Sequence, residues 1–248
     1  MIILKTPQEI EKMRVSGRMV AEILEELKKA IKPDVSTEEL DRLAERRITS
    51  KGAIPAFKGY RGFPKSLCIS LNEEVVHGIP SRRKIKEGDI VSIDLGVLFQ
   101  GFYGDAAITV PVGKISLQGQ RLLEVTERAL WVGIEQAEKG RFVSDISHSI
   151  QSFVECCGFS VVRAFVGHGM GASLHEDPQV PNFGLPGRGP RIKEGMVLAI
   201  EPMVNQGCSE VEILEDKWTV VTADRTLSAH FEHTIAITHQ GVEILSLL

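Results

Sequence analysis

Apolar residues recur at helical spacing in four stretches of the chain. Before the second stretch, Ser36 and Glu39 have the spacing of a capping box, in which each side chain accepts a hydrogen bond from the other residue's backbone N–H. Ser144 stands at the corresponding place before the fourth stretch, and these two stretches end near Gly52 and Gly158. The pattern predicts helices over residues 6–33, 36–51, 117–138 and 144–157.

Short apolar runs predict β-strands over residues 67–71 and 90–110, and again from about residue 160 to the C-terminus. Within the second run, Gln100-Gly101 is a suitable two-residue turn, which makes this segment a β-hairpin. Across such a turn, two residues whose numbers add up to an odd value share a face, since side chains alternate along each strand. Asp94 and Asp105 therefore point to the same side and are placed to bind one ion together.

One pattern of polar and apolar residues occurs twice. Residues 86–94 and 193–201 each begin with Lys-Glu-Gly, continue as an apolar strand and end in a carboxylate, Asp94 or Glu201. Burying a carboxylate costs several kcal/mol unless an opposite charge compensates it. Two carboxylates at equivalent ends of two buried strands therefore indicate a cation between them, on a pseudo-twofold axis.

The repeat extends beyond these two strands. In the second half Glu232 is the counterpart of Asp105, and a looser correspondence joins His77-Gly78 with His168-Gly169. We therefore expect two similar halves, with helices outside and antiparallel strands around the metal site. The predicted organisation is a single catalytic domain over residues 1–248, with an internal repeat of approximately 1–115 and 116–248.

The amino-acid composition is typical of a globular protein. Of the 248 residues, 43% are hydrophobic and 25% charged, and the net charge of -4 argues against a sequence-specific nucleic-acid-binding protein. No apolar run is long enough to span a membrane and the N-terminus lacks the pattern of a secretory signal, so we expect a cytoplasmic protein. The four cysteines lack the spacing of a zinc site and are expected to be reduced thiols.

Five of the residues in and around the repeat are suitable metal ligands. Four are carboxylates and one is an imidazole, so oxygen dominates and no sulfur selects a soft metal. Four negative charges suit two divalent ions better than one. The alternative is that these acids are surface charges at hairpin ends, but their symmetric placement after buried strands favours a metal site. The candidate ligands are Asp94, Asp105, His168, Glu201 and Glu232, and the candidate ions are manganese, iron, cobalt and zinc.

Two further histidines, His77 and His175, lie in glycine-rich segments beside the candidate ligands. A single histidine is more often structural than catalytic. Here both are placed to donate hydrogen bonds to a substrate amide or its developing oxyanion, which favours a catalytic role. A loop rich in proline and glycine, residues 178–190, separates two site segments and is expected to lie near the mouth of the site.

Several motifs, in order along the chain, resemble those of methionine aminopeptidases of the first, bacterial-type class, which form subfamily A of the M24 metallopeptidases. They are the segments 65–80, 104–107, 167–171, 199–202 and 231–234. The resemblance covers essentially the whole chain and implies an α+β pita-bread fold. It also implies a metal-dependent hydrolase that removes the initiator methionine from newly made polypeptides when the second residue is small. The family's metal ligands fall on the five candidates named above, which implies two divalent ions per chain.

The same resemblance implies roles for individual residues. Glu201 is expected to move the proton of the attacking water, His175 to stabilise the tetrahedral intermediate, and His77 to contact the scissile amide. The substrate's methionine side chain is expected to lie among Tyr60, Phe63, Cys68 and Trp218. Plain core packing is the alternative for these four residues, and some relatives carry an aromatic residue where this chain has Leu174.

Two other functions remain to be distinguished. A pita-bread protein that has lost catalysis would only bind peptides, but such relatives usually have an incomplete ligand set. An imidodipeptidase that cleaves before proline shares the fold, but prolidases carry a large extra N-terminal domain, for which there is no room before the helix near Thr6. The expected partner is the N-terminus of a nascent polypeptide. The enzyme is expected to be a monomer. The basic segment 82–86 either docks transiently to the ribosome or is a solvated turn, and the acidic net charge favours the turn.

Overall fold

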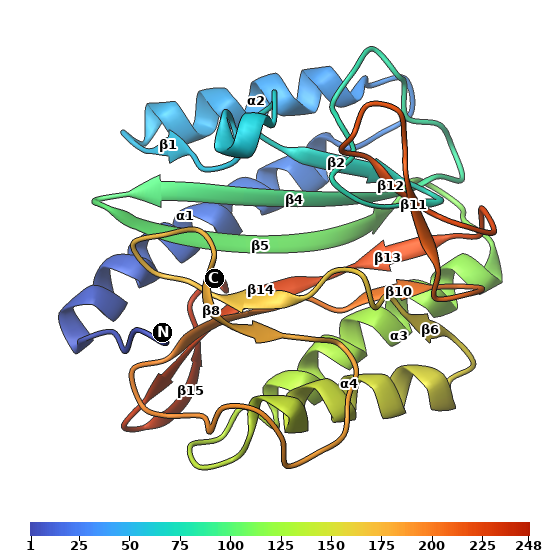
Figure 1. The fold of residues 1–248 in the computed structure, drawn as a ribbon. Coiled ribbons are helices and arrows are strands. Elements are labelled where there is room, and N and C mark those ends of the chain that lie inside the picture. Colours follow the sequence, from blue (N-terminus) through green and yellow to red (C-terminus); the bar gives the residue numbers. More distant parts are fainter.

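The computed structural model describes residues 1–248 and combines four α-helices with fifteen strands (Figure 1). The helices are α1 (Pro7–Ala30), α2 (Thr37–Ser50), α3 (Leu117–Ile134) and α4 (Val143–Cys156), with a short 3-10 helix η1 (Tyr60–Gly62). The strands are β1 (Ile54–Pro55), β2 (Cys68–Leu71), β3 (Glu74–Val76), β4 (Ile90–Phe99), β5 (Phe102–Pro111), β6 (Ser160–Val161), β7 (Gly167–Gly169), β8 (Glu176–Val180), β9 (Val197–Ile200), β10 (Met203–Asn205), β11 (Val211–Ile213), β12 (Val220–Thr222), β13 (Ser228–His230), β14 (Glu232–Thr238) and β15 (Gly241–Ile244).

All four predicted helices are confirmed, with small differences at their ends. The capping box of α2 is present: Glu39 N–H donates to Ser36 Oγ at 3.3 Å, and Ser36 N–H donates to the Glu39 carboxylate at 2.7 Å. Helix α3 ends at Ile134 and not at residue 138. The next amides, of Gln136 and Ala137, bond carbonyls three residues back, and this tighter winding terminates the α-helix.

The predicted N-cap of α4 is wrong by two residues. Phe142 is the N-cap residue, and its backbone N–H donates to the Asp145 carboxylate at 2.8 Å. Ser144 lies inside the first turn, where its hydroxyl accepts a hydrogen bond from the Arg188 backbone N–H at 2.7 Å. The Ser144 hydroxyl, which local spacing predicts to cap the helix, therefore binds the loop that contains Arg188.

A sheet of nine antiparallel strands runs through both halves of the chain. Its order is β1-β4-β5-β14-β9-β7-β8, with β2 also paired to β4 and β15 to β14. The β4–β5 hairpin turns at Gln100-Gly101, as predicted, and Asp94 lies opposite Ala107. Asp94 therefore shares a face with Asp105, which lies two residues from Ala107 along β5. The two halves meet where β14 pairs with β5.

The repeated Lys-Glu-Gly segments form the same turn in both halves. Gly88 and Gly195 have φ values of 90° and 87°, a conformation that strains any residue with a side chain. Their backbone N–H groups bond Val112 O and Ile237 O, each at 2.8 Å, and so fasten the turn to the chain at the far end of β5 or β14. This shared turn sets where β4 and β9 begin. The acid six residues after the glycine ends the strand only in the second copy: Glu201 directly follows β9, whereas Asp94 lies in the middle of β4, which continues to Phe99 because it pairs with β5 along its whole length.

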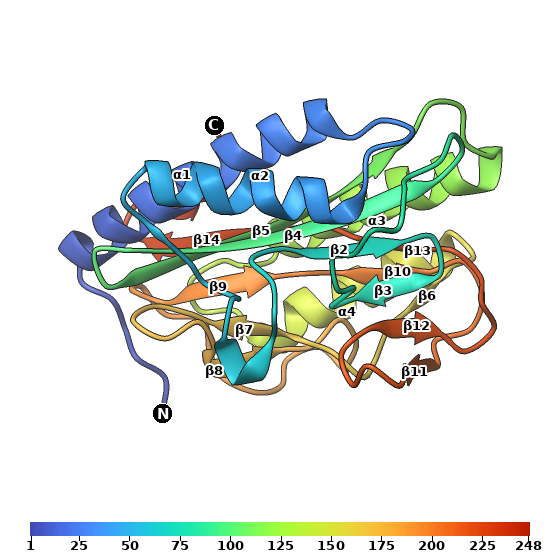
Figure 2. The ribbon, with the colours of Figure 1, turned by 90° about the horizontal axis from the view of Figure 1, so that it is seen from above.

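Two helix pairs bury the two parts of the sheet. One apolar cluster packs α1 and α2 against β2, β4 and neighbouring residues, and a second packs α3 and α4 against β9, β14 and neighbouring residues. Figure 2 shows α1 and α2 lying along β4 and β5, with β7, β8, β11 and β12 at the opposite side of the molecule. The four cysteines are free, as predicted. None of the helices combines the length and the apolar character that crossing a bilayer requires.

Candidate metal centre and active site

Every residue predicted for the site lines one cavity of about 260 Å³. The predicted ligands come from five places in the large sheet: β4, β5, β7, β14 and the residue directly after β9. The predicted substrate residues come from η1, β2, the β11–β12 turn and the segments around them. Residues from both halves of the chain thus meet in one cavity, which is the arrangement expected from the repeat.

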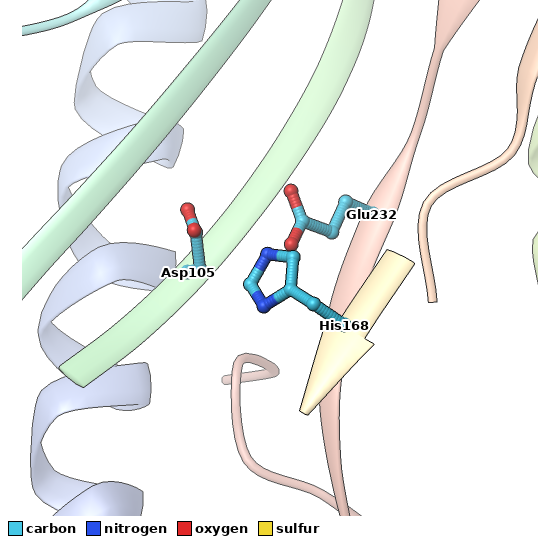
Figure 3. Close-up of side chains that lie close together, drawn as sticks. All are labelled: Asp105, His168 and Glu232. Atoms are coloured by element: carbon cyan, nitrogen blue, oxygen red, sulfur yellow. The ribbon is translucent and has the colours of Figure 1, made fainter. Parts of the chain in front are cut away.

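Three of the predicted ligands lie closest together. One ligand atom each from Asp105, His168 and Glu232 lies within 4.8 Å of the others, and all three residues are buried. Figure 3 shows the three side chains pointing toward one another from β5, β7 and β14. Glu201 borders this group, with its Oε1 3.6 Å from His168 Nε2. Asp94 lies on the same face of the hairpin as Asp105 and lines the same cavity.

The carboxylates of this group are buried without a compensating positive charge from the protein. No lysine or arginine forms an ion pair with any of the four predicted acids. Burial raises the pKa of Asp94 to about 7, and burial together with mutual repulsion raises the pKa of Asp105, Glu201 and Glu232 well above the usual range. One oxygen each of Asp94, Asp105 and Glu232 is buried with no hydrogen-bond partner. Such unpaired oxygens fit a site that receives divalent cations.

His168 is oriented as a metal ligand. Its Nδ1 lies 3.0 Å from the carbonyl oxygen of Gly169, which requires the proton on Nδ1. Burial lowers the pKa of His168, so the ring is neutral and Nε2 keeps its lone pair. That nitrogen faces the carboxylates, as a ligating imidazole does when a backbone carbonyl fixes its tautomer.

The two additional histidines line the same cavity and make different contacts. His175 Nδ1 is 2.7 Å from the Tyr60 hydroxyl, and the His175 ring lies 4.2 Å from that of His168 between centroids. The ring of His77 packs edge-on against Phe165, at 5.4 Å between centroids. Burial lowers the pKa of His77 to about 4. Partial desolvation, with His168 and Arg61 nearby, lowers the pKa of the more exposed His175 to about 3, so both imidazoles are neutral at physiological pH. Each then carries one N–H donor.

His230 also lines the cavity, and the sequence analysis missed it. It is fully buried, its Nε2 has no hydrogen-bond partner, and this atom lies 3.9 Å from Glu201 Oε2. The signal was available, because His230 precedes Glu232 by two residues and alternate residues of an extended segment face the same side.

The predicted substrate residues form an apolar wall of the cavity. Trp218 meets Phe63 edge-on, at 5.1 Å between ring centroids, and Cys68 is buried with a raised pKa that keeps its thiol protonated. Leu174 is buried and lines the same cavity. Several of these side chains also pack in an apolar cluster with residues of α1, as the alternative of core packing predicts.

The loop 178–190, expected near the mouth of the site, touches site segments without forming the cavity wall. None of its residues lines the cavity. Instead it packs along α4, where Gly184 N–H donates to Gln151 at 3.0 Å and Gly187 N–H donates to Asp145 at 2.7 Å. It reaches the site segments at two places: Gln179 of β8 pairs with His168 of β7, and the Asn182 amide donates to the backbone carbonyl of Glu201 at 3.0 Å. The prolines and glycines correctly predict a loop here, but the path of the loop is set by its contacts with α4.

Comparisons with known proteins agree with this geometry. Residues 11–239 match metallopeptidase family M24. Methionine aminopeptidase 1 of Bacillus subtilis is 59% identical over 246 residues, covering 99% of both chains. The crystal structure of methionine aminopeptidase from Thermotoga maritima covers all of both chains with a TM-score of 0.98 and 49% identity. A prolidase from Pyrococcus furiosus, at 22% identity and a TM-score of 0.80, matches in fold over 99% of this chain and 66% of its own.

The fold is thus the pita-bread fold that prolidases share, and the predicted fold class is confirmed. The family name implies a metal ion, in agreement with the buried donor cluster, so divalent metal binding is a property of this chain. Its curated relatives over the full length are aminopeptidases and not proline-directed enzymes. The chain therefore belongs to metallopeptidase family M24, among its bacterial-type methionine aminopeptidases.

Proposed function

We propose that the chain removes the initiator methionine from newly made polypeptides with a small second residue, using two divalent ions in one catalytic domain. The observation that carries the proposal is the buried set of four carboxylates and one imidazole without a protein cation, open to an apolar cavity. Four negative charges match two divalent ions. Asp94, Asp105, His168, Glu201 and Glu232 would hold them, and the donor set suits manganese, iron, cobalt or zinc.

The residues around the ions have separate tasks in the proposed reaction. The chemistry expected of the bound ions is Lewis-acid activation of a water and of the scissile carbonyl. Glu201 takes a proton from the attacking water and returns it to the leaving nitrogen, a task suited to a carboxylate that lines the cavity beside His168. His175 donates an N–H to the developing oxyanion, and His77 contacts the scissile amide.

The hydrogen bond between Tyr60 and His175 supports this role. If the Tyr60 hydroxyl donates to Nδ1, the single proton of the neutral ring resides on Nε2. Tyr60, Phe63, Cys68 and Trp218 then surround the methionine side chain, which a thiol and aromatic rings accommodate well. An aminopeptidase must also bind the free amine of its substrate, and a metal ion held by the five proposed ligands would supply the site for that amine.

A peptide assay tests the proposed activity directly. With added manganese or cobalt, the protein should release methionine from Met-Ala-Ser and should leave Ala-Pro intact. Cleavage of Ala-Pro alone would identify an imidodipeptidase, and binding without cleavage of either peptide would identify an inactive pita-bread protein. Failure to release methionine from Met-Ala-Ser under these conditions would overturn the proposal.

Replacing His175 with alanine should lower kcat about a hundredfold, because one oxyanion donor typically contributes this much. The metal content should not change, since His175 lies outside the proposed donor set. We would measure kcat on Met-Ala-Ser and metal binding by isothermal titration calorimetry. The matched control is His148→Ala, an exposed histidine on α4, which should keep full activity. Wild-type turnover in His175→Ala would contradict the assigned role.

We further propose a monomeric enzyme that meets nascent polypeptides in the cytoplasm. For the basic segment 82–86 we favour the solvated turn over a ribosome contact. Arg83 already forms an ion pair with Glu74 at 2.6 Å, which leaves fewer free positive charges for RNA. Co-sedimentation with ribosomes at increasing salt separates the two interpretations, because docking through this segment requires an affinity that falls steeply with salt.

A further inference from the structure

One lysine of this protein is buried together with a glutamate. The side chains of Lys5 and Glu176 form an ion pair and are only 4% and 7% exposed. In every other lysine or arginine pair, the basic side chain is at least 26% exposed, as in the pair of Lys65 with Asp41. Lys5 therefore stands apart from the ordinary surface ion pairs of this chain.

The remaining polar atoms of this pair are also bonded. Lys5 Nζ donates to the carbonyl of Ile3 at 2.9 Å, and the second oxygen of Glu176 accepts from the backbone N–H of Ser173 at 3.1 Å. The backbone N–H of Lys5 donates to the carbonyl of Gly195, in the repeated turn, at 2.6 Å. The N-terminal segment is thus fastened at one point to the sheet and at another to residues 173–176.

Residues 171–176 form the turn that carries Leu174 and His175 into the cavity. Lys5 lies directly against this turn, since a Cβ on Gly171 would stand 2.2 Å from Lys5 Cε and 2.8 Å from its Nζ. Glu176 is the residue next to His175, and its carboxylate also holds the Ser173 amide. The ion pair therefore fixes the turn just before and just after His175.

Stability alone is a weak reason for such a pair. Removing two charges from water costs several kcal/mol, and a pair of apolar side chains of similar volume often stabilises a protein as well or better. Holding a segment in one geometry is a better use of the interaction. We propose that Lys5 and Glu176 are positioning residues that hold the turn of His175, so that this imidazole stands beside the proposed metal ligands. The inference rests on the role of His175 in the proposed function.

The test is a double-mutant cycle in the full-length, metal-loaded enzyme. Lys5→Met keeps the aliphatic stem and removes the charge, and it should lower kcat on Met-Ala-Ser at least about tenfold with KM changed much less. In a His175→Ala background the same substitution should change kcat less than about twofold, because the group it positions is gone. Arg14→Met is the matched control, since it removes the partly exposed ion pair between α1 and β15 and should leave kcat unchanged.

A second variant and a second measurement address folding. Lys5→Met/Glu176→Met removes both charges, so its melting temperature should recover relative to the single variant while kcat stays low. In the metal-free protein, hydrogen exchange at the amides of Ser173 and His175 should be faster in Lys5→Met than in the wild type. If the pair only stabilised the fold, kcat of Lys5→Met/Glu176→Met would recover together with its melting temperature.

The outcomes separate this inference from the proposed function. If His175→Ala retains full kcat, the assigned role of His175 fails, and the positioning role fails with it. If His175→Ala is impaired but folded Lys5→Met is not, only the positioning role is overturned. An equal loss of kcat from Lys5→Met in both backgrounds would also overturn it, because Lys5 would then act independently of His175.

Discussion

Glu201→Gln should lower kcat for methionine release at least about a thousandfold while the protein remains folded. The substitution keeps the shape of the side chain and removes the group proposed to transfer protons, which alone contributes about a hundredfold to ten-thousandfold. It also removes one of the four buried charges, so metal affinity should fall. Steady-state kinetics on Met-Ala-Ser at saturating manganese would separate the loss of proton transfer from the loss of metal.

Glu194→Gln is the matched control for this experiment. Glu194 belongs to the same repeated segment, seven residues earlier, but its carboxylate is 46% exposed and pairs with Lys139. Removing an exposed charge of this kind should change neither kcat nor metal affinity measurably. A Glu201→Gln enzyme within tenfold of the wild-type kcat would show that another group moves the proton.

Chelation of the metal should destabilise the protein, and the loss should be larger at pH 8 than at pH 5. The folded, metal-free protein binds more protons than the unfolded chain between the ordinary carboxyl pKa, near 4, and the raised value of about 7 for Asp94. Its free energy of unfolding therefore falls as the pH rises through this window. Bound cations replace those protons, so the metal-loaded protein should not show this fall.

Calorimetric melting with and without EDTA at several pH values measures this effect. We expect the gap in melting temperature to widen by roughly 5 to 10 °C between pH 5 and pH 8, because a few kcal/mol shift the melting of a domain of this size by that amount. Asp94→Asn is the informative variant, since it removes a buried charge and should stabilise the metal-free protein at pH 8. A metal-free wild-type protein that became more stable over this pH range would contradict the prediction.

Local patterns along the sequence were sufficient for the helices, the β4–β5 hairpin and the shared side of Asp94 and Asp105. These features depend on residues close together in the chain: a capping box, a two-residue turn and the alternation of strand side chains. The repeat added the correspondence between Asp94 and Glu201, because a duplicated turn places residues at the same distance from its glycine equivalently. The resemblance to a known family supplied the pocket residues, which no local pattern would have singled out.

Contacts between distant segments decided the rest. Ser144 was predicted to cap α4, but it binds the backbone of Arg188, and the loop after β8 follows α4 instead of the cavity. Likewise, nothing in the sequence around Lys5 predicts its burial against Glu176. Each of these outcomes pairs groups tens of residues apart or more, and the partner exists only once the sheet has formed. The sequence by itself determined which residues are candidates for the chemistry, whereas the tertiary structure decided how each is held, because burial and hydrogen-bond partners arise only from packing.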